Sequence, residues 1–231
     1  AEYSTNGTTW NNANGVTITL ANIGDKVYFR GVISGNQSYD NCAKFNMTGL
    51  IAASGSIMSM YNNNPDDVVL NYKYCYYNMF YGCTSLVTAP ELPATTLASD
   101  CYSSMFSGCT SLTTAPELPA TTLASWCYNQ MFIGCTSLVT APSILPASTL
   151  TSGCYNSMFQ SCTSLVTAPE LPATTLVSSC YGSMFKHCDK LNYIKCLATD
   201  ISVSNCTYEW FYSYKSTTGT FVTPASTPWT T

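Results

Sequence analysis

A repeat of about 26 residues constrains this chain more than any other feature of its sequence. One series of cysteines recurs at steps of 26 or 27 residues: Cys75, Cys101, Cys127, Cys154, Cys180 and Cys206. A second series keeps the same steps: Cys83, Cys109, Cys135, Cys162 and Cys188. Each pair frames the pattern C-Y-x-x-M-F-x-x-C, which occurs five times, and x-x-L-x-T-A-P follows the first four. Regularly placed leucines at such a period are typical of stacked turns that each hold a strand and a short helix.

The repeat therefore predicts an α/β solenoid, a leucine-rich-repeat stack of about 26-residue turns closed by small β-rich caps. Each turn is expected to hold one short parallel strand and one short helix. Cys101 and Met105 lie four residues apart, which suits one buried helical face. The residues expected in the core of one turn are Leu112, Ala115, Leu118 and Leu123 with Cys101, Met105, Phe106 and Cys109.

Energetics explain why the turn is copied. Burying seven or eight such side chains contributes on the order of 10 to 20 kcal/mol. Fixing the backbone of one whole turn costs roughly 26 to 50 kcal/mol. A single turn is therefore not expected to fold unless neighbouring turns cover its open faces.

The repeat also divides the chain into three expected regions. These are an N-terminal β-rich cap at residues 1–54, the repeats at residues 55–206 and a C-terminal cap at residues 207–231. Ile57 and Met60 lie one period before Cys83 and Leu86, and they are therefore expected in a degenerate first turn. Stepping forward places Leu191, Ile194, Val203 and Cys206 in a last turn, with Phe211 at the position that Phe185 occupies one period earlier.

The flanks carry strand patterns of their own. Residues 16–20 and 26–30 alternate in polarity and are separated by a polar stretch, which predicts a unit like a β-hairpin. Residues 219–223 predict a last strand before an end rich in Pro and Thr.

Charge and hydropathy exclude two classes of partner. Only 9% of the residues are charged, the net charge is −4, and no Lys or Arg occurs between residues 74 and 185. A basic surface for phosphate backbones is missing, so nucleic acid is excluded as a partner. The longest apolar runs are much shorter than the ~18 residues of a membrane span, so none is expected.

The motif F-x-x-C-x-x-L with a downstream L-P resembles the leucine-rich repeats of BspA-like surface proteins of Bacteroides and Treponema. The resemblance covers roughly residues 55–206. It extends to the flanks G-D-K-V-Y-F-R-G at residues 24–31 and T-G-T-F-V at residues 218–222. It implies a secreted or surface-anchored protein that acts in adhesion and performs no catalysis. Cys101 and its equivalents stand where the family places Ile.

The thirteen cysteines allow three interpretations. Equivalent side chains in successive turns are expected about 4.8 Å apart, close enough for contact. The columns are disulfides, soft-metal sites or small buried hydrophobic side chains, and the third interpretation is favoured. No zinc spacing is present, and no metal ligand or cofactor is predicted. Cys42 and Cys196 stand outside both columns.

The expected binding surface is the outer face of the strands. Its predicted residues form an uncharged strip: Val87, Thr88, Thr113, Thr114, Val139, Thr140, Val166 and Thr167. Such faces are where repeat proteins usually bind extended partners. Simple duplication of the repeat would also produce the strip.

Further contact residues are suggested by two other columns. Glu91, Glu117 and Glu170 share one place in the repeat, where a cation site and a solvated edge are alternatives. Trp126 stands where the other copies have Asp100, Gly153 and Ser179, and an exposed Trp there is a plausible contact residue. Positions that vary between copies are expected to face solvent, among them Tyr77, Asn78, Tyr81, Ser103, Ser104 and Ser107.

The sequence thus favours a non-catalytic, secreted or cell-surface binding protein that contacts a protein or glycan through its strand face. No catalytic residue is predicted, because the single histidine, His187, adjoins a cysteine assigned to the core. The alternative is a structural spacer or fibre subunit, cellular or phage-borne, with self-assembling ends. A thiol-based metal store is a third hypothesis, and the oligomeric state is not predicted.

Overall fold

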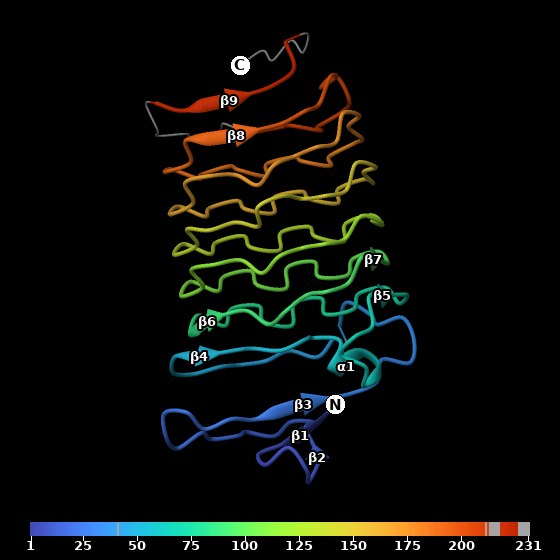
Figure 1. Cartoon of the computed structure of the whole chain (residues 1–231), viewed down its shortest axis with the longest axis vertical. Coiled ribbons are helices and arrows are strands. Elements are labelled where there is room, and N and C mark those ends of the chain that lie inside the picture. The colour runs from blue at the N-terminus through green and yellow to red at the C-terminus, as the bar shows by residue number, and fades with distance from the viewer. Residues whose placement is uncertain (41, 211, 213–217, 226–231) are drawn as a thin grey trace.

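The structure is a computed structural model that describes residues 1–40, 42–210, 212 and 218–225. Figure 1 shows layers of chain stacked between an N-terminal sheet and a pair of C-terminal strands. The helix and all of the strands are short. In chain order they are β1 (Glu2–Ser4), β2 (Asn11–Asn12), β3 (Tyr28–Arg30), β4 (Ile51–Ala52), α1 (Ser59–Asn62), β5 (Val69–Leu70), β6 (Leu86–Thr88), β7 (Thr96–Leu97), β8 (Tyr193–Lys195) and β9 (Thr220–Val222).

Each layer is one copy of the repeat, because backbone amides bond to carbonyls about one period away. Phe106 N donates to Met131 O at 2.9 Å, and Phe132 N donates to Met158 O at 2.9 Å. Few of these bonds build regular sheet. Among the described residues, the strands form one three-stranded and three two-stranded sheets, and isolated parallel bridges join further layers.

The predicted α/β solenoid with a helix in every turn is wrong. Within the described residues there is one α-helix, α1, which has four residues and precedes the first C-Y-x-x-M-F-x-x-C unit. The sheets are small and separate from one another, with β4 pairing β6, β5 pairing β7 and β8 pairing β9. The stack is therefore built mainly from turns and isolated bridges.

The C-Y-x-x-M-F-x-x-C units are ribbons of successive turns rather than helices. In the second copy, Met105 N donates to Tyr102 O at 3.1 Å inside the layer, whereas Phe106 N donates to the next layer at Met131 O. Alternate amides keep this pattern along the ribbon. An α-helix would use these amides for bonds to carbonyls four residues earlier in the same segment.

The backbone dihedrals of the ribbons also exclude a helix. Asp100, Ser104 and Gly108 have φ angles of 59°, 53° and 74°, so the chain turns into the left-handed region at every fourth residue. A right-handed helix requires a negative φ at each residue. The same positions are left-handed in the neighbouring copies, for example at Trp126 and Gln130.

The predicted core residues are confirmed. The eight side chains named for one turn have exposed fractions between 0 and 9%. Equivalent tyrosines from Tyr76 to Tyr181 stack with ring centroids 5.6 to 5.8 Å apart. The phenylalanines from Phe80 to Phe185 form a second column at 5.4 to 6.1 Å. Two aromatic columns thus run through the centre of the repeats.

The expectation that variable positions face solvent is wrong for most of them. Tyr77, Ser103 and Ser104 are buried, and Tyr81 is exposed. In a helix these positions would lie opposite the buried face. In the ribbon, the adjacent layers cover them, because alternate peptide groups bond to those layers.

The N-terminal region is a sheet with the order β2-β1-β3, so the predicted hairpin between residues 16–20 and 26–30 is wrong. Residues 16–20 form no strand, and β3 pairs antiparallel with β1 instead. Glu2 lies opposite Arg30 in that pair, and their side chains form an ion pair at 2.8 Å. The Arg30 guanidinium also lies 4.1 Å from the centre of the Trp10 ring.

The ends of the stack follow the expected positions where they are described. Ile57 is buried, Met60 packs half-buried against the core, and Leu191, Ile194 and Cys206 are buried. The predicted last strand is confirmed as β9, which pairs parallel with β8. Trp210 closes the aromatic columns against Tyr181 and Phe185. The prediction for Phe211, and part of the predicted C-terminal cap, lie outside the described residues.

Candidate functional site

The predicted strand face holds a row of exposed threonines, here called the first threonine row: Thr88, Thr114, Thr140 and Thr167. Parallel bridges join Thr114 to Thr140 and Thr140 to Thr167, and the row continues to Tyr193. At the other end, Thr88 in β6 lies opposite Ala52 in β4. The row therefore crosses successive layers at one register position.

In two of the layers, a local irregularity turns two consecutive residues outward. Val139 N and Thr140 N both donate to Thr113 O, at 2.9 and 3.2 Å. Two residues opposite one is the arrangement of a β-bulge, which interrupts the usual alternation of sides. Thr113 and Val139 are consequently exposed beside the row, whereas Val87 and Val166 are half-buried.

The glutamates of the predicted acidic column have different surroundings. Glu91 and Glu117 are exposed, whereas Glu170 is half-buried and pairs with Lys195 at 2.7 Å. The hydrogen bond to Glu170 raises the pKa of Lys195. Ile144 occupies the column between Glu117 and Glu170, as its parallel bridge to Glu170 shows. The three glutamates therefore do not form a continuous acidic column, because Ile144 interrupts it and Lys195 neutralises Glu170.

Trp126 is 39% exposed and adopts a left-handed backbone with a φ of 61°. Its ring lies over Gly153 in the next layer, where a Cβ would come within 2.4 Å of the indole. Glycine therefore leaves the space that the ring fills. Trp126 is thus an aromatic side chain held at the surface, at a position where the other copies have Asp100, Gly153 and Ser179.

A second row of hydroxyl groups was not predicted from the sequence. It consists of Thr96, Thr122, Thr149 and Thr175, here called the second threonine row. Thr96 pairs in parallel with Val69 on one side and with Thr122 on the other, and Thr175 forms a parallel β-bridge with Asp200. The recurring A-T-T-L, which is A-S-T-L in one copy, was the signal that could have identified it.

The cysteine columns are buried and hold free thiols. Thiols of the second column donate to carbonyls of the preceding layer, for example Cys109 to Phe80 O and Cys135 to Phe106 O, both at 3.1 Å. Burial raises the pKa of these thiols, to about 12 at Cys135 and Cys188. They are therefore protonated near neutral pH and join the layers as hydrogen-bond donors.

The side chains considered for catalysis or metal binding are placed as follows. His187 packs edge-on against Tyr212 at 5.8 Å, while the neighbouring Cys188 thiol donates to Phe159 O at 3.0 Å. In the described part of the chain, no group of three His, Cys, Asp or Glu side chains is arranged to hold a metal ion. Cys196 is buried and Cys42 is half-buried.

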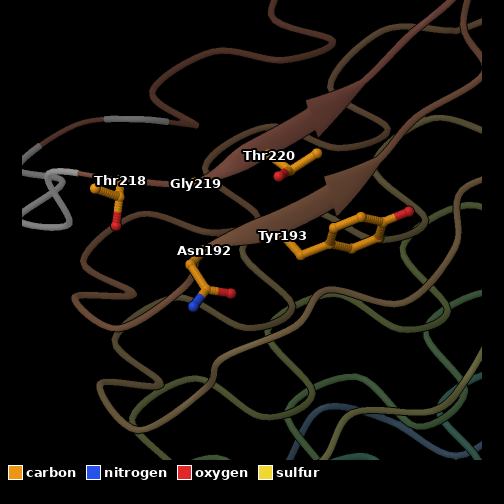
Figure 2. A pocket seen from close by; sticks show the side chains of 5 residues that line it. All are labelled: Asn192, Tyr193, Thr218, Gly219 and Thr220. Atoms are coloured by element: carbon orange, nitrogen blue, oxygen red, sulfur yellow. The ribbon is translucent and has the colours of Figure 1, made fainter.

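A shallow hollow of about 460 Å³ lies where β8 and β9 begin (Figure 2). Its lining residues are Asn192, Tyr193, Thr218, Gly219 and Thr220. Gly219 permits a close approach, because a Cβ there would lie 2.9 Å from Asn192 O. Tyr193 is the point where the hollow meets the end of the first threonine row.

Comparison with known proteins does not extend these observations, because no family model, curated protein or solved structure matches the chain. Among the described residues, no helix has the length and apolar character needed to cross a membrane.

Proposed function

We propose that this protein is a non-catalytic binding protein whose first threonine row contacts an extended protein or glycan. The observation that carries the proposal is the run of exposed threonines joined by parallel bridges from Thr114 to Thr167, with Thr88 exposed one period earlier in the sequence. Regularly spaced hydroxyls suit a ligand that also repeats along its length. The absence of Lys and Arg between residues 74 and 185 makes a polyanion an unsuitable ligand.

The proposed location is the bacterial cell surface or the extracellular space, with a role in adhesion. Support comes from the sequence resemblance to BspA-like repeats. The free thiols of the cysteine columns do not decide the location, because the thiols are buried and protonated. The resemblance is therefore the support for location, and the threonine row is the support for binding.

The test is a double substitution, Thr114→Glu with Thr140→Glu, which places two like charges side by side on the row. Binding would be measured by surface plasmon resonance against extracellular-matrix proteins and neutral polysaccharides. We expect at least tenfold weaker binding to any ligand that the parent protein recognises. The matched control is Thr96→Glu with Thr122→Glu, a bridged pair on the second threonine row.

Two outcomes would overturn the proposal. One is that the parent protein binds nothing on the panel. The other is that both double variants bind as the parent does, which would move the binding surface away from the row. Circular dichroism of both variants would establish that each retains the parent fold.

A structural spacer or fibre subunit is the second candidate. The observation in its favour is the uninterrupted run of the tyrosine and phenylalanine columns through every copy, which gives the stack a uniform cross-section. This candidate requires assembly through the ends. Light scattering that finds only monomer at high concentration would count against it.

A further inference from the structure

Cys75 and Cys101 lie side by side in consecutive layers. Tyr102 N donates to Cys75 O at 3.0 Å, which in a parallel arrangement places residue 101 directly opposite residue 75. Residues paired in this way have Cα atoms separated by about 4.8 Å. That separation falls inside the range of roughly 4.4 to 6.8 Å that a disulfide needs.

The two thiols also converge on one acceptor. Cys75 Sγ donates to Tyr72 O at 2.9 Å, and Cys101 Sγ donates to the same oxygen at 3.2 Å. The thiols of the second column differ, because Cys109, Cys135, Cys162 and Cys188 each donate to a carbonyl of a different residue. A shared carbonyl brings the sulfurs of Cys75 and Cys101 together. A hydrogen bond between these two thiols also raises the pKa of Cys75.

The backbone changes at the same two layers. Tyr76 and Tyr102, which follow the two cysteines, both have a φ of 62°, in the left-handed region that L residues rarely adopt. The equivalent tyrosines at 128, 155 and 181 do not have a positive φ. Tyr102 N bonds to the preceding layer, whereas Tyr128 N bonds to the following one at Cys154 O. The residue after the cysteine therefore has a backbone geometry in these two layers that the later copies do not share.

We propose that Cys75 and Cys101 are a disulfide-forming pair that cross-links the first two C-Y-x-x-M-F-x-x-C copies. The oxidant is a low-molecular-weight disulfide, RSSR. One cysteine thiolate attacks RSSR, its S–S bond breaks, and a mixed disulfide and RS⁻ result. The second thiolate attacks the protein sulfur of the mixed disulfide and releases another RS⁻. The two protons from the cysteines pass to the leaving thiolates, so one RSSR is reduced to two RSH.

The cross-link would act where the repeats meet the N-terminal region. Cys42, which lies outside the repeats, donates its thiol to Tyr74 O at 3.5 Å, next to Cys75. Phe45 N also donates to Met79 O at 2.7 Å, so the chain before the repeats forms the adjoining layer. A bond between Cys75 and Cys101 would join the layer on which this region rests to the next layer.

The test is made at equilibrium, because both thiols are fully buried and would exchange slowly in the folded protein. The chain is unfolded and reduced, then refolded in mixtures of reduced and oxidised glutathione. Remaining thiols are alkylated, and cross-linked peptides are quantified by mass spectrometry. We expect the Cys75–Cys101 disulfide to be at least tenfold more abundant than any other cross-link in the folded fraction.

The matched variants are Cys75→Ser and Cys154→Ser. Cys154 lies in the same column, and its carbonyl also accepts from a tyrosine amide, that of Tyr128. It has neither the shared thiol acceptor nor a following tyrosine with a positive φ. We expect Cys75→Ser to lose the two-electron oxidation and Cys154→Ser to keep it. A folded protein that keeps all thirteen thiols at the most oxidising ratio would overturn the proposal, as would a cross-link at Cys127 and Cys154 of equal abundance.

Discussion

At the residue scale, Trp126 and Gly153 illustrate how one copy of the repeat departs from the others. Both positions have a left-handed backbone, with φ angles of 61° and 64°. The large ring is accommodated because the next layer offers no side chain at the same place. The two substitutions in the repeat therefore depend on each other, which a comparison of copies by sequence does not reveal.

We expect Gly153→Ala to displace the Trp126 ring into solvent. A Cβ at position 153 would overlap the indole at 2.4 Å, in addition to the cost of a positive φ. The matched control is Gly134→Ala, because Gly134 has a φ of 73° but its Cβ would meet only the Gly108 backbone at 3.9 Å. The control is expected to lower the free energy of unfolding by about 1 to 2 kcal/mol. Gly153→Ala is expected to cost ~1 kcal/mol more through lost ring burial.

The measurement combines urea unfolding with tryptophan emission. A red shift in Gly153→Ala that disappears in a Trp126→Phe background would locate the change at this ring. Equal stabilities of the two alanine variants, with no spectral shift, would show that the ring and Gly153 are not in contact.

At the element scale, the ribbon of turns explains why a helix was predicted. Cys101, Met105 and Cys109 recur every four residues, and this spacing serves a helix and a ribbon of turns equally well. A helix and a ribbon of turns differ in the backbone conformation and hydrogen bonds of the residues that lie between these core positions. Ser104 enters the left-handed region, and Phe106 N bonds to the next layer. Serine at such a position carries no strong conformational signal, so the pattern alone could not separate the two structures.

Substitutions at Gln130 distinguish a ribbon from a helix, because the two structures predict opposite signs for the difference in free energy of unfolding between glycine and alanine. Gln130 has a φ of 56°, so glycine is expected to be more stable than alanine there by about 1 kcal/mol. In a helix, glycine would be less stable than alanine by a similar ~1 kcal/mol. Urea unfolding would compare Gln130→Gly with Gln130→Ala. Both variants lack the glutamine amide, so its contribution to stability drops out of the difference.

Asn129 supplies the control, because it precedes Gln130 and does not have a positive φ. Asn129→Gly is expected to be less stable than Asn129→Ala. If glycine were the less stable choice at both positions, the ribbon would be contradicted and a helical segment supported.

At the scale of the whole molecule, the buried thiols couple stability to alkaline pH. Burial raises the pKa of Cys154 and Cys196 to about 11, and that of Cys135, Cys180 and Cys188 to about 12. The unfolded thiols ionise near pH 8.5. The folded chain therefore holds protons that the unfolded chain releases. The associated stability is fully present below about pH 8.5 and is lost as the pH rises towards the folded values.

We expect the free energy of unfolding to fall steeply between pH 8 and pH 10. Unfolded tyrosines, whose pKa is about 10, add to the fall at the upper end of this range, because burial raises the pKa of Tyr102 and Tyr128 in the folded chain. Each buried thiol contributes a loss of about 1.4 kcal/mol for every pH unit above its unfolded pKa. Urea unfolding under reducing conditions at several pH values would measure the slope. Cys135→Ala should be less stable at pH 7 but show a shallower slope. An unchanged free energy between pH 8 and pH 10 would mean that the thiols are not buried.

The sequence by itself determined the apolar core and the step from layer to layer, but not the burial of the variable positions such as Ser103 and Ser104. Cys101, Met105, Phe106 and Leu112 are all in the core, because apolar residues at fixed places in a repeat must be covered by the neighbouring copies. It also located the row from Thr88 to Thr167 and the strand β9.

Only the tertiary structure decided the path of the chain between those fixed points. The periodicity could not show that alternate amides bond to neighbouring layers, that β1 rather than residues 16–20 pairs with β3, or that Lys195 neutralises Glu170. Each of these depends on partners about a period or more away in the chain. The physical reason is that the pattern of apolar side chains indicates which residues form the core. The hydrogen bonds between layers determine the backbone conformation that places these residues there.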